Sequence, residues 1–182
     1  IKKYFGAQAG DECRLVYHFS LAEQLFLSVL RNDRKPVDAM VAESSGIPAD
    51  CQWAAFLRNH DELSLQTCTD AERNEIFSYC DPGMTHAFRG NSGLSMRMAS
   101  IFGQDMEKIR KAFALLFTLP AAPIIYYGEE IGMVNDTAIT PQDTRRYVRG
   151  AFDWAYARAQ MQNPNSLFSF VAGLARERKK LY

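Results

Sequence analysis

Residues 123–130 read PIIYYGEE, and this stretch decides the fold class. Its first five residues are apolar or aromatic with no polar residue between them, so a strand over 123–127 is expected to be buried on both faces. Such strands are typical of parallel sheets covered by helices, whereas amphipathic strands are typical of antiparallel sheets. Gly128 predicts a turn directly after the strand, and the turn leads into the carboxylates of Glu129 and Glu130.

Two further strand–helix units precede this strand. Residues 14–19 (RLVYHF) predict a strand, and residues 20–30 predict a helix that opens with the capping-box pattern SLAE. Residues 53–57 predict a second strand, and residues 69–79 predict a helix that opens with a second capping box, TDAE. Each unit therefore pairs a short apolar run with a helix that has its own start signal.

The second half of the chain continues this alternation. Residues 105–119 predict a strongly amphipathic helix, which Pro120 ends before the strand at 123–127. Residues 81–103 predict irregular structure with short helical turns, 134–164 a long loop, and 165–181 a last helix. Successive strand–helix units favour right-handed crossovers and a parallel sheet, so the sequence predicts an α/β fold with functional residues at the carboxyl ends of the strands.

The overall composition is that of a soluble globular protein with one sizeable core. The chain has 182 residues, of which 47% are hydrophobic and 23% are charged. Lys and Arg together number 21, as do Asp and Glu, and no basic stripe appears beyond residues 176–180. We therefore expect no nucleic-acid partner. Because the chain starts at Ile1, we expect it to be a piece of a longer protein, and no signal peptide opens it.

The cysteines and the apolar runs bear on location and metal binding. The four cysteines have no Cys-x-x-Cys spacing and only three histidines to join them, which predicts free thiols in a reducing, cytoplasmic compartment, with no metal or other cofactor. The longest apolar stretch, 112–125, is interrupted by Thr118, Pro120 and Pro123. It is too short and too broken to span a bilayer, so we expect no membrane partner.

Residues 56–62 (FLRNHDE) are the strongest candidate for a functional site. An apolar approach ends there in an amide, an imidazole and two carboxylates, where the second predicted strand stops. Consecutive hydrogen-bonding side chains at a strand end are more typical of a binding mouth than of a core. The alternative is an ordinary polar transition from strand to loop.

Two stretches resemble the α-amylase superfamily, glycoside hydrolase family 13. FLRNHDE resembles the family segment on the seventh barrel strand, and residues 119–133 (LPAAPIIYYGEEIGM) resemble the eighth strand. Within the superfamily, residues 12–19 and 51–63 most resemble trehalose synthases and their α-glucosidase relatives. The resemblance implies that the chain is the carboxyl-terminal part, strands six to eight with their helices, of a (β/α)8 TIM barrel.

The resemblance also implies roles for two residues of this mouth. Asp61 matches the family's third carboxylate, which binds the sugar hydroxyls and helps to distort the ring toward an oxocarbenium-like transition state. His60 matches the neighbouring histidine that hydrogen-bonds the same sugar, although a histidine packed against a backbone carbonyl is the alternative. The nucleophile and the acid/base of the retaining mechanism lie on the family's fourth and fifth strands, which would precede Ile1.

The predicted substrate-binding set also includes Arg149 and Asn59. Residues 148–154 (VRGAFDW) resemble a family loop in which the arginine contacts the sugar, which points to Arg149, although four of the loop's seven residues differ. Arg145 or Arg146 is an alternative for that role, and so is a plain surface position for Arg149. Asn59 is a weaker candidate beside His60.

Two hypotheses fit the role of the carboxylates that follow the third predicted strand. Glu129 is included in the predicted substrate-binding set because it lies at a strand end. In the family, the glutamates of this strand support the rim of the barrel. The alternative is that Glu129 or Glu130 forms a complete acid pair with Asp61 within this chain.

Taken together, residues 1–182 are expected to form a single partial domain of a glycosidase barrel. The full-length enzyme would be an α-glucoside-acting hydrolase or transglucosylase with a disaccharide or oligosaccharide substrate, and the isolated chain would be inactive. The alternative is a non-catalytic carbohydrate-binding or assembly domain derived from the barrel. Three strands with open edges should associate with the missing amino-terminal half of the barrel or with another copy of the chain.

Overall fold

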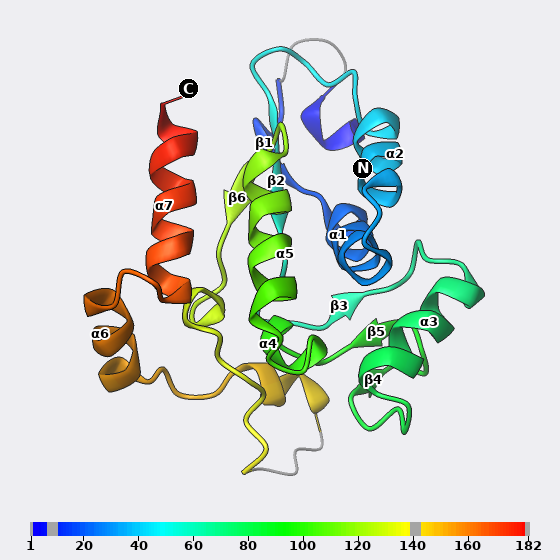
Figure 1. The fold of residues 1–182 in the computed structure, drawn as a ribbon. Coiled ribbons are helices and arrows are strands. Elements are labelled where there is room, and N and C mark those ends of the chain that lie inside the picture. Colours follow the sequence, from blue (N-terminus) through cyan, green and yellow to red (C-terminus); the bar gives the residue numbers. More distant parts are fainter. Residues whose placement is uncertain (1, 7–10, 139–142, 181–182) are drawn as a thin grey trace.

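A parallel three-stranded sheet forms the centre of the molecule. The structure is a computed structural model that describes residues 2–6, 11–138 and 143–180. Strands β1 (Leu15–Tyr17), β2 (Gln52–Phe56) and β6 (Ala122–Ile124) pair in the order β1-β2-β6, and both pairings are parallel. In register, Val16 lies opposite Trp53 and Ala55 lies opposite Pro123. The three strands lie side by side behind helix α5 (Met106–Thr118) in Figure 1. The predicted parallel sheet is therefore confirmed.

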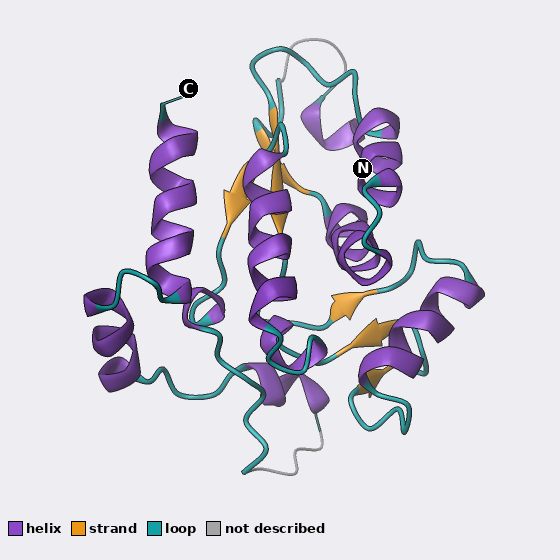
Figure 2. Cartoon of the chain, viewed as in Figure 1, coloured by secondary structure: helices purple, strands orange, loops and turns teal. Residues whose placement is uncertain are grey.

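Helices surround this sheet, and a small second sheet lies to one side (Figure 2). The α-helices are α1 (Phe19–Arg31), α2 (Lys35–Glu43), α3 (Asp70–Cys80), α4 (Met98–Ile101), α5 (Met106–Thr118), α6 (Trp154–Gln162) and α7 (Leu167–Lys179). Three short 3-10 helices are η1 (Lys2–Phe5), η2 (Glu129–Ile131) and η3 (Thr144–Val148). The second sheet is antiparallel and joins β3 (Leu63–Ser64), β5 (Gly93–Leu94) and β4 (Ala87–Phe88) in that order.

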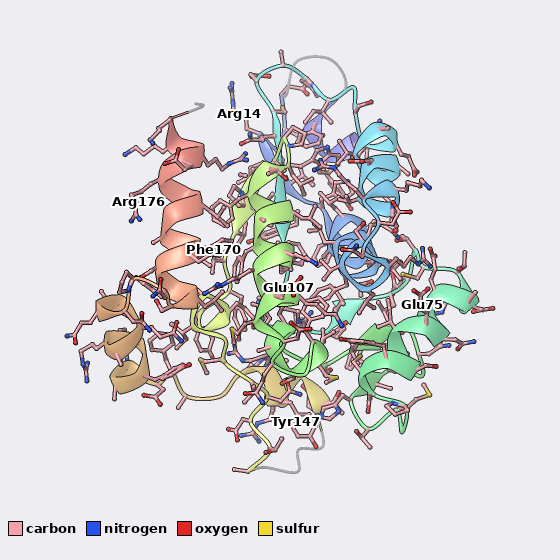
Figure 3. All side chains as sticks on the ribbon, viewed as in Figure 1. Arg14, Glu75, Glu107, Tyr147, Phe170 and Arg176 are labelled. Carbon is pink, nitrogen blue, oxygen red and sulfur yellow. The ribbon has the colours of Figure 1, made fainter. Side chains whose placement is uncertain are left out.

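The core lies between the sheet and the helices α1 and α5. Leu25 and Phe26 of α1, Phe56 of β2 and Phe113 of α5 are almost completely buried in one cluster. Phe26 also packs on Phe102, with ring centroids 5.4 Å apart. Charged side chains such as that of Arg176 lie on the outer surface of the helices (Figure 3). None of the helices in the described ranges is long and apolar enough to cross a membrane.

Several predicted helix starts are confirmed at the level of individual bonds. Thr69 and Glu72 form the reciprocal capping box of α3, in which each side chain accepts from the backbone N–H of the other. Asp105 caps α5, and Ser166 caps α7 by accepting from the N–H of Ser169. These caps satisfy amides that a helix cannot pair internally.

The capping box predicted for Ser20 and Glu23 is wrong. The helix starts one residue earlier, and His18 is its cap, because His18 Nδ1 accepts from the N–H of Leu21 at 3.1 Å. Glu23 is instead fully buried and accepts from Thr67 Oγ1 at 2.7 Å. The carboxylate of Glu23 therefore forms a tertiary hydrogen bond and, contrary to the local pattern, does not cap the helix.

Other parts of the chain hold more structure than predicted. The segment 81–103 contains the four-residue helix α4, which confirms the predicted short helical turns, and adds the strands β4 and β5, which were not predicted. The loop 134–164 contains η3 and α6, and α2 had no prediction at all. The strand predicted over 123–127 covers only 122–124 and is half-buried, so the expected burial of both faces is wrong. Within the described residues β6 pairs only with β2, and Ile125, which follows β6, is 39% exposed.

Candidate functional site

The loop after β2 is folded so that the carboxylate of Asp61 faces outward. The fully buried Arg58 donates from Nη2 to the backbone carbonyl of Asp61 at 2.7 Å. Asn59 Oδ1 accepts from the N–H of Asp61 at 2.9 Å, a side-chain bond of the kind that closes tight turns. The backbone of Asp61 is therefore fixed on both sides, and its side chain remains 38% exposed.

Arg149, His60 and Arg145 meet at Asp61. The first two were predicted to bind the substrate, and Arg145 was an alternative to Arg149. Arg149 donates from Nη2 to Asp61 Oδ1 and from Nε to the carbonyl of His60, each at 2.7 Å. His60 Nε2 lies 3.3 Å from Asp61 Oδ2. Arg145 Nη1 lies 3.6 Å from Asp61 Oδ1. The fold thus brings Arg149, 88 residues away in the sequence, into direct contact with the FLRNHDE loop.

The segment that carries these arginines is anchored at several points. Asp143 binds Arg145 through both carboxylate oxygens, at 2.8 to 3.1 Å, and these bonds lower the pKa of Asp143 to about 2. Thr144 Oγ1 lies 3.0 Å from Ser95 Oγ, which ties η3 to the end of β5. The backbone carbonyl of Val148 accepts from Tyr126 Oη at 3.2 Å. Arg145 and Arg149 therefore reach Asp61 from a braced segment.

Glu129 lies in the interior rather than at the mouth. It is 2% exposed, and its oxygens are bound to Arg97 Nη1 at 3.0 Å and to the N–H of Met98 at 3.1 Å. Burial raises its pKa to about 7, against the opposing effect of Arg97 and Arg58. The same Arg97 donates to the carbonyl of Tyr127 at 2.9 Å. This burial speaks against a sugar contact for Glu129 and against an acid pair between it and Asp61.

Sequence reasoning assigned no role to two buried arginines, Arg58 within the FLRNHDE loop and Arg97 beside Glu129. Arg97 is completely buried, and its guanidinium lies 5.0 Å and 4.9 Å from the ring centroids of Tyr126 and Tyr127. Arg58 is equally buried, and burial lowers its pKa to about 10. An arginine set between apolar residues, as in Met96-Arg97-Met98, is the signal that was available, because a charge in such a run needs a specific partner.

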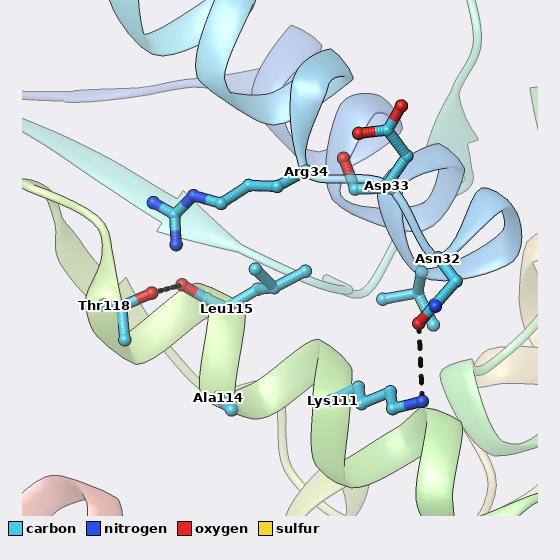
Figure 4. Close-up of a pocket in the computed structure, with 9 residues that line it drawn as sticks. Asn32, Asp33, Arg34, Lys111, Ala114, Leu115 and Thr118 are labelled. Carbon is cyan, nitrogen blue, oxygen red and sulfur yellow. Dashed lines mark hydrogen bonds between the residues drawn. The ribbon is translucent and has the colours of Figure 1, made fainter.

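A groove between the end of α1 and α5 lies apart from this cluster. It measures about 410 Å³, and Asn32, Lys111 and Thr118 are among its lining residues (Figure 4). Lys111 Nζ donates to Asn32 Oδ1 at 3.4 Å, and Thr118 bonds the carbonyl of Leu115. These contacts hold helix ends together and provide no reactive grouping. Within the described ranges, no cluster of His, Cys, Asp and Glu is arranged to hold a metal ion.

Comparison with known protein families gives a match over more than half of the chain. The family described as alpha amylase, catalytic domain, matches residues 84–180. Trehalose synthase/amylase TreS of Mycobacterium tuberculosis is 39% identical over 135 residues, which cover 73% of this chain and 22% of the relative. Trehalose synthase of Thermus thermophilus is 34% identical over 197 aligned residues, covering 92% of this chain and 20% of the relative. The chain thus spans about a fifth of the length of these curated relatives.

Solved structures share the fold. Sucrose 6F-phosphate phosphorylase from Thermoanaerobacter thermosaccharolyticum superposes with a TM-score of 0.73 at 17% identity, over 90% of this chain and 36% of that one. An α-amylase from H. orenii superposes with a TM-score of 0.57 at 22% identity, over 93% and 32%. The parallel sheet and its helices therefore correspond to part of a TIM barrel of this kind. Both the sequence match and the shared fold place this chain in the α-amylase family, with a resemblance to trehalose synthases.

Proposed function

We propose that residues 1–182 form one partial domain that supplies strands six to eight of the catalytic barrel in an α-glucoside-acting enzyme. β1, β2 and β6 would be those strands. The observation that carries the proposal is the cluster at Asp61, where Arg149 at 2.7 Å and His60 at 3.3 Å meet a carboxylate at the carboxyl end of β2. Carboxyl ends of barrel strands are where active sites form in this fold.

Asp61 would serve both binding and catalysis. Its carboxylate can accept charge-assisted hydrogen bonds from sugar hydroxyls, and its fixed negative charge favours the positive charge that develops at the anomeric carbon. Arg149 holds Asp61 in place through one carboxylate oxygen. His60 and Asn59 also contact Asp61 and would bind the same sugar. A retaining mechanism also needs a nucleophile and an acid/base, which we assign to earlier strands of the barrel.

The substrate class follows from the relatives and from the site chemistry. Trehalose synthases and 4-alpha-glucanotransferases are among the similar proteins, so we propose a disaccharide or oligosaccharide α-glucoside and either hydrolysis or glucosyl transfer. We place the enzyme in the cytoplasm, because all four cysteines are free thiols. The 182-residue chain alone should not turn over maltose, trehalose or an aryl α-glucoside.

The decisive experiment is Asp61→Asn in the complete enzyme. We expect kcat to fall by about 100-fold or more, while the unfolding midpoint changes little, because the amide keeps the size of the side chain but loses its charge. Arg146→Gln is the matched control: Arg146 was an alternative to Arg149 in the sequence, but in the described residues it is exposed, and Arg145 and Arg149 are the arginines that reach Asp61. Unchanged turnover in the Asp61 variant would remove this residue from the site.

A second candidate function, a binding or assembly domain without catalysis, rests on the open edges of the sheet. In the described residues β1 and β6 are the outer strands of this sheet, so their free backbone edges suit pairing with another chain, and Leu15 and Tyr17 on β1 are each 51% exposed. The two functions differ in one measurement. Turnover that depends on Asp61 supports the enzyme, and sugar binding without any turnover by the complete protein supports the binding domain.

A further inference from the structure

Two tyrosines shortly after β6 bond the backbone on either side of Arg149. The hydroxyl of Tyr126 donates to the carbonyl of Val148 at 3.2 Å. The hydroxyl of Tyr127 donates to the carbonyl of Gly150 at 2.7 Å. The residues directly before and directly after Arg149 are therefore both tied to the end of the same strand.

The backbone at Arg149 has little local support of its own. The 3-10 helix η3 ends at Val148, and such helices are short and have poor hydrogen-bond geometry. The N–H of Arg149 bonds the carbonyl of Arg146 at 3.1 Å, and residues 149–153 form no helix or strand before α6 begins at Trp154. The position of Arg149 therefore depends on contacts with other parts of the fold.

The tyrosine pair, Tyr126 and Tyr127, is itself held firmly. The two rings are perpendicular, with centroids 4.6 Å apart. The guanidinium of the completely buried Arg97 lies 5.0 Å and 4.9 Å from the two centroids, and its Nη1 donates to the carbonyl of Tyr127 at 2.9 Å. Cation–π contacts are strongest where water is excluded, so the rings have a fixed support. Burial also raises the pKa of Tyr126, so its hydroxyl keeps the hydrogen that it donates.

The two bonds of the Arg149 guanidinium demand such support. Nη2 donates to Asp61 Oδ1 and Nε donates to the carbonyl of His60, each at 2.7 Å. Because the guanidinium is planar and rigid, both bonds form only when the backbone of Arg149 is correctly placed. Functional side chains have to be held within about 0.5 Å of their productive geometry. A long, flexible side chain meets that limit only on a fixed backbone.

We propose that Tyr126 and Tyr127 are positioning residues that set Arg149 against Asp61. They act through Arg149, because their hydroxyls bond the backbone around it. Loss of either hydroxyl leaves a carbonyl without its donor, so the segment can shift and Arg149 can lose its bonds. The consequence for turnover rests on the proposed function, in which Asp61 belongs to the active site.

The first test is steady-state kinetics of Tyr126→Phe and Tyr127→Phe in the complete enzyme. Each change removes one hydroxyl and keeps the ring. We expect kcat/KM to fall by about threefold to tenfold, the range expected when one hydrogen bond is lost. Tyr79→Phe is the matched control, because its hydroxyl bonds Lys108 Nζ at 2.8 Å and joins α3 to α5 instead. An equal loss in the Tyr79 variant, or no loss in the other two, would overturn the proposal.

The same changes in an Arg149→Gln background separate positioning from general stabilisation. Residues that act through Arg149 have nothing left to position there, so the tyrosine variants should cause no further loss of kcat/KM. A purely structural role would lower kcat/KM by the same factor in both backgrounds. That result would overturn the role of the tyrosine pair.

Arginine labelling with phenylglyoxal gives a measurement that does not depend on turnover. We expect Arg149 to react about threefold or more faster in Tyr126→Phe and Tyr127→Phe than in the original enzyme, because its guanidinium is released from Asp61. Peptide mass spectrometry measures the rate, and Arg158, an exposed arginine on α6, is the internal reference. Unchanged labelling of Arg149 in both variants would contradict the proposal.

The outcomes separate this proposal from the proposed function. If the tyrosine variants label faster at Arg149 while Asp61→Asn keeps full turnover, the active-site proposal fails and the positioning of Arg149 stands. If Asp61→Asn abolishes turnover while the tyrosine variants label and turn over as the original enzyme does, the positioning proposal fails and the active site stands.

Discussion

At the scale of single residues, Arg145 lies between two carboxylates, those of Asp143 and Asp61, and its position decides how accessible Asp61 is to a ligand. Arg145 binds Asp143 at 2.8 Å and lies 3.6 Å from Asp61 Oδ1, the oxygen that Arg149 already occupies. Sugar hydroxyls would have to compete with every guanidinium that closes on Asp61. By holding Arg145, Asp143 therefore keeps part of the Asp61 carboxylate available to a ligand.

Asp143→Asn should raise KM of the complete enzyme for its α-glucoside. The substitution removes the charge that holds Arg145, so Arg145 can move onto Asp61 and oppose sugar binding. Because exposed ion pairs contribute up to roughly 1 kcal/mol, we expect KM to increase by about threefold to fivefold, with a smaller change in kcat. Steady-state kinetics at fixed ionic strength measures both.

A double variant decides whether Arg145 is responsible. Adding Arg145→Gln to Asp143→Asn should bring KM back toward the original value, whereas adding Arg146→Gln should not, because Arg146 is exposed in the same segment. No recovery on removal of Arg145 would contradict this account of the segment.

His18 makes folding stability depend on pH. Burial lowers its pKa from 6.5 to about 4, and Nδ1 accepts from Leu21, so the neutral ring is the native form. A group whose pKa is depressed in the folded state contributes stability that is lost as the pH falls. We expect a loss of about 2 kcal/mol between pH 7 and pH 5 from this residue.

His18→Asn tests that contribution, because asparagine can still cap α1 but does not titrate. Urea unfolding should show that the change in unfolding free energy from pH 7 to pH 5 is about 2 kcal/mol more favourable in the variant than in the original chain. Glu129, whose pKa is raised to about 7, acts in the opposite direction over this range and is present in both proteins. The same pH dependence in both would show that His18 does not titrate on unfolding.

At the scale of elements, the capping box of α3 makes a local contribution to folding stability that can be measured. Thr69 accepts from the N–H of Glu72 at 3.2 Å, and Glu72 accepts from the N–H of Thr69 at 3.0 Å. Thr69→Ala should lower the free energy of unfolding by about 1 kcal/mol. Asn74→Ala, an exposed change within the same helix, should not destabilise the chain. Thermal unfolding followed by circular dichroism compares the two, and equal midpoints would contradict the contribution of the cap.

The two capping-box patterns of this chain show when local sequence is enough to predict a helix cap. Thr69 and Glu72 lie at an accessible helix start, where their mutual bonds face little competition. The pattern at Ser20 and Glu23 is equally good in sequence, but Thr67 and Cys68 lie within hydrogen-bond distance of Glu23 and take its carboxylate. A local pattern holds only where the fold does not offer its residues a better partner.

At the scale of the whole molecule, the central sheet has exposed apolar residues at its margins. Leu15 and Tyr17 on β1 are each 51% exposed, and Ile125 after β6 is 39% exposed. Among the described residues β1 and β6 are also the outer strands of this sheet, and open strand edges favour pairing with further strands. We expect the isolated chain to self-associate at micromolar concentration, which sedimentation velocity would detect.

Charge at the edge should prevent this association. Leu15→Lys with Tyr17→Lys should shift the chain toward the monomer, because lysines blunt an open strand edge. Tyr156→Lys is the control, since that side chain is equally exposed but lies on α6. A monodisperse monomer before any substitution, or the same association in both variants, would contradict the role of this edge.

The sequence by itself determined the alternation of strands and helices, the parallel sheet and the FLRNHDE loop, because apolar periodicity and helix caps act between near neighbours. It also pointed to Asp61, His60 and Arg149. Only the tertiary structure decided that Arg149 contacts Asp61 and that Glu129 is buried against Arg97. These pairings join residues 88 and 32 positions apart. Such contacts depend on how the elements pack, and no local pattern encodes that.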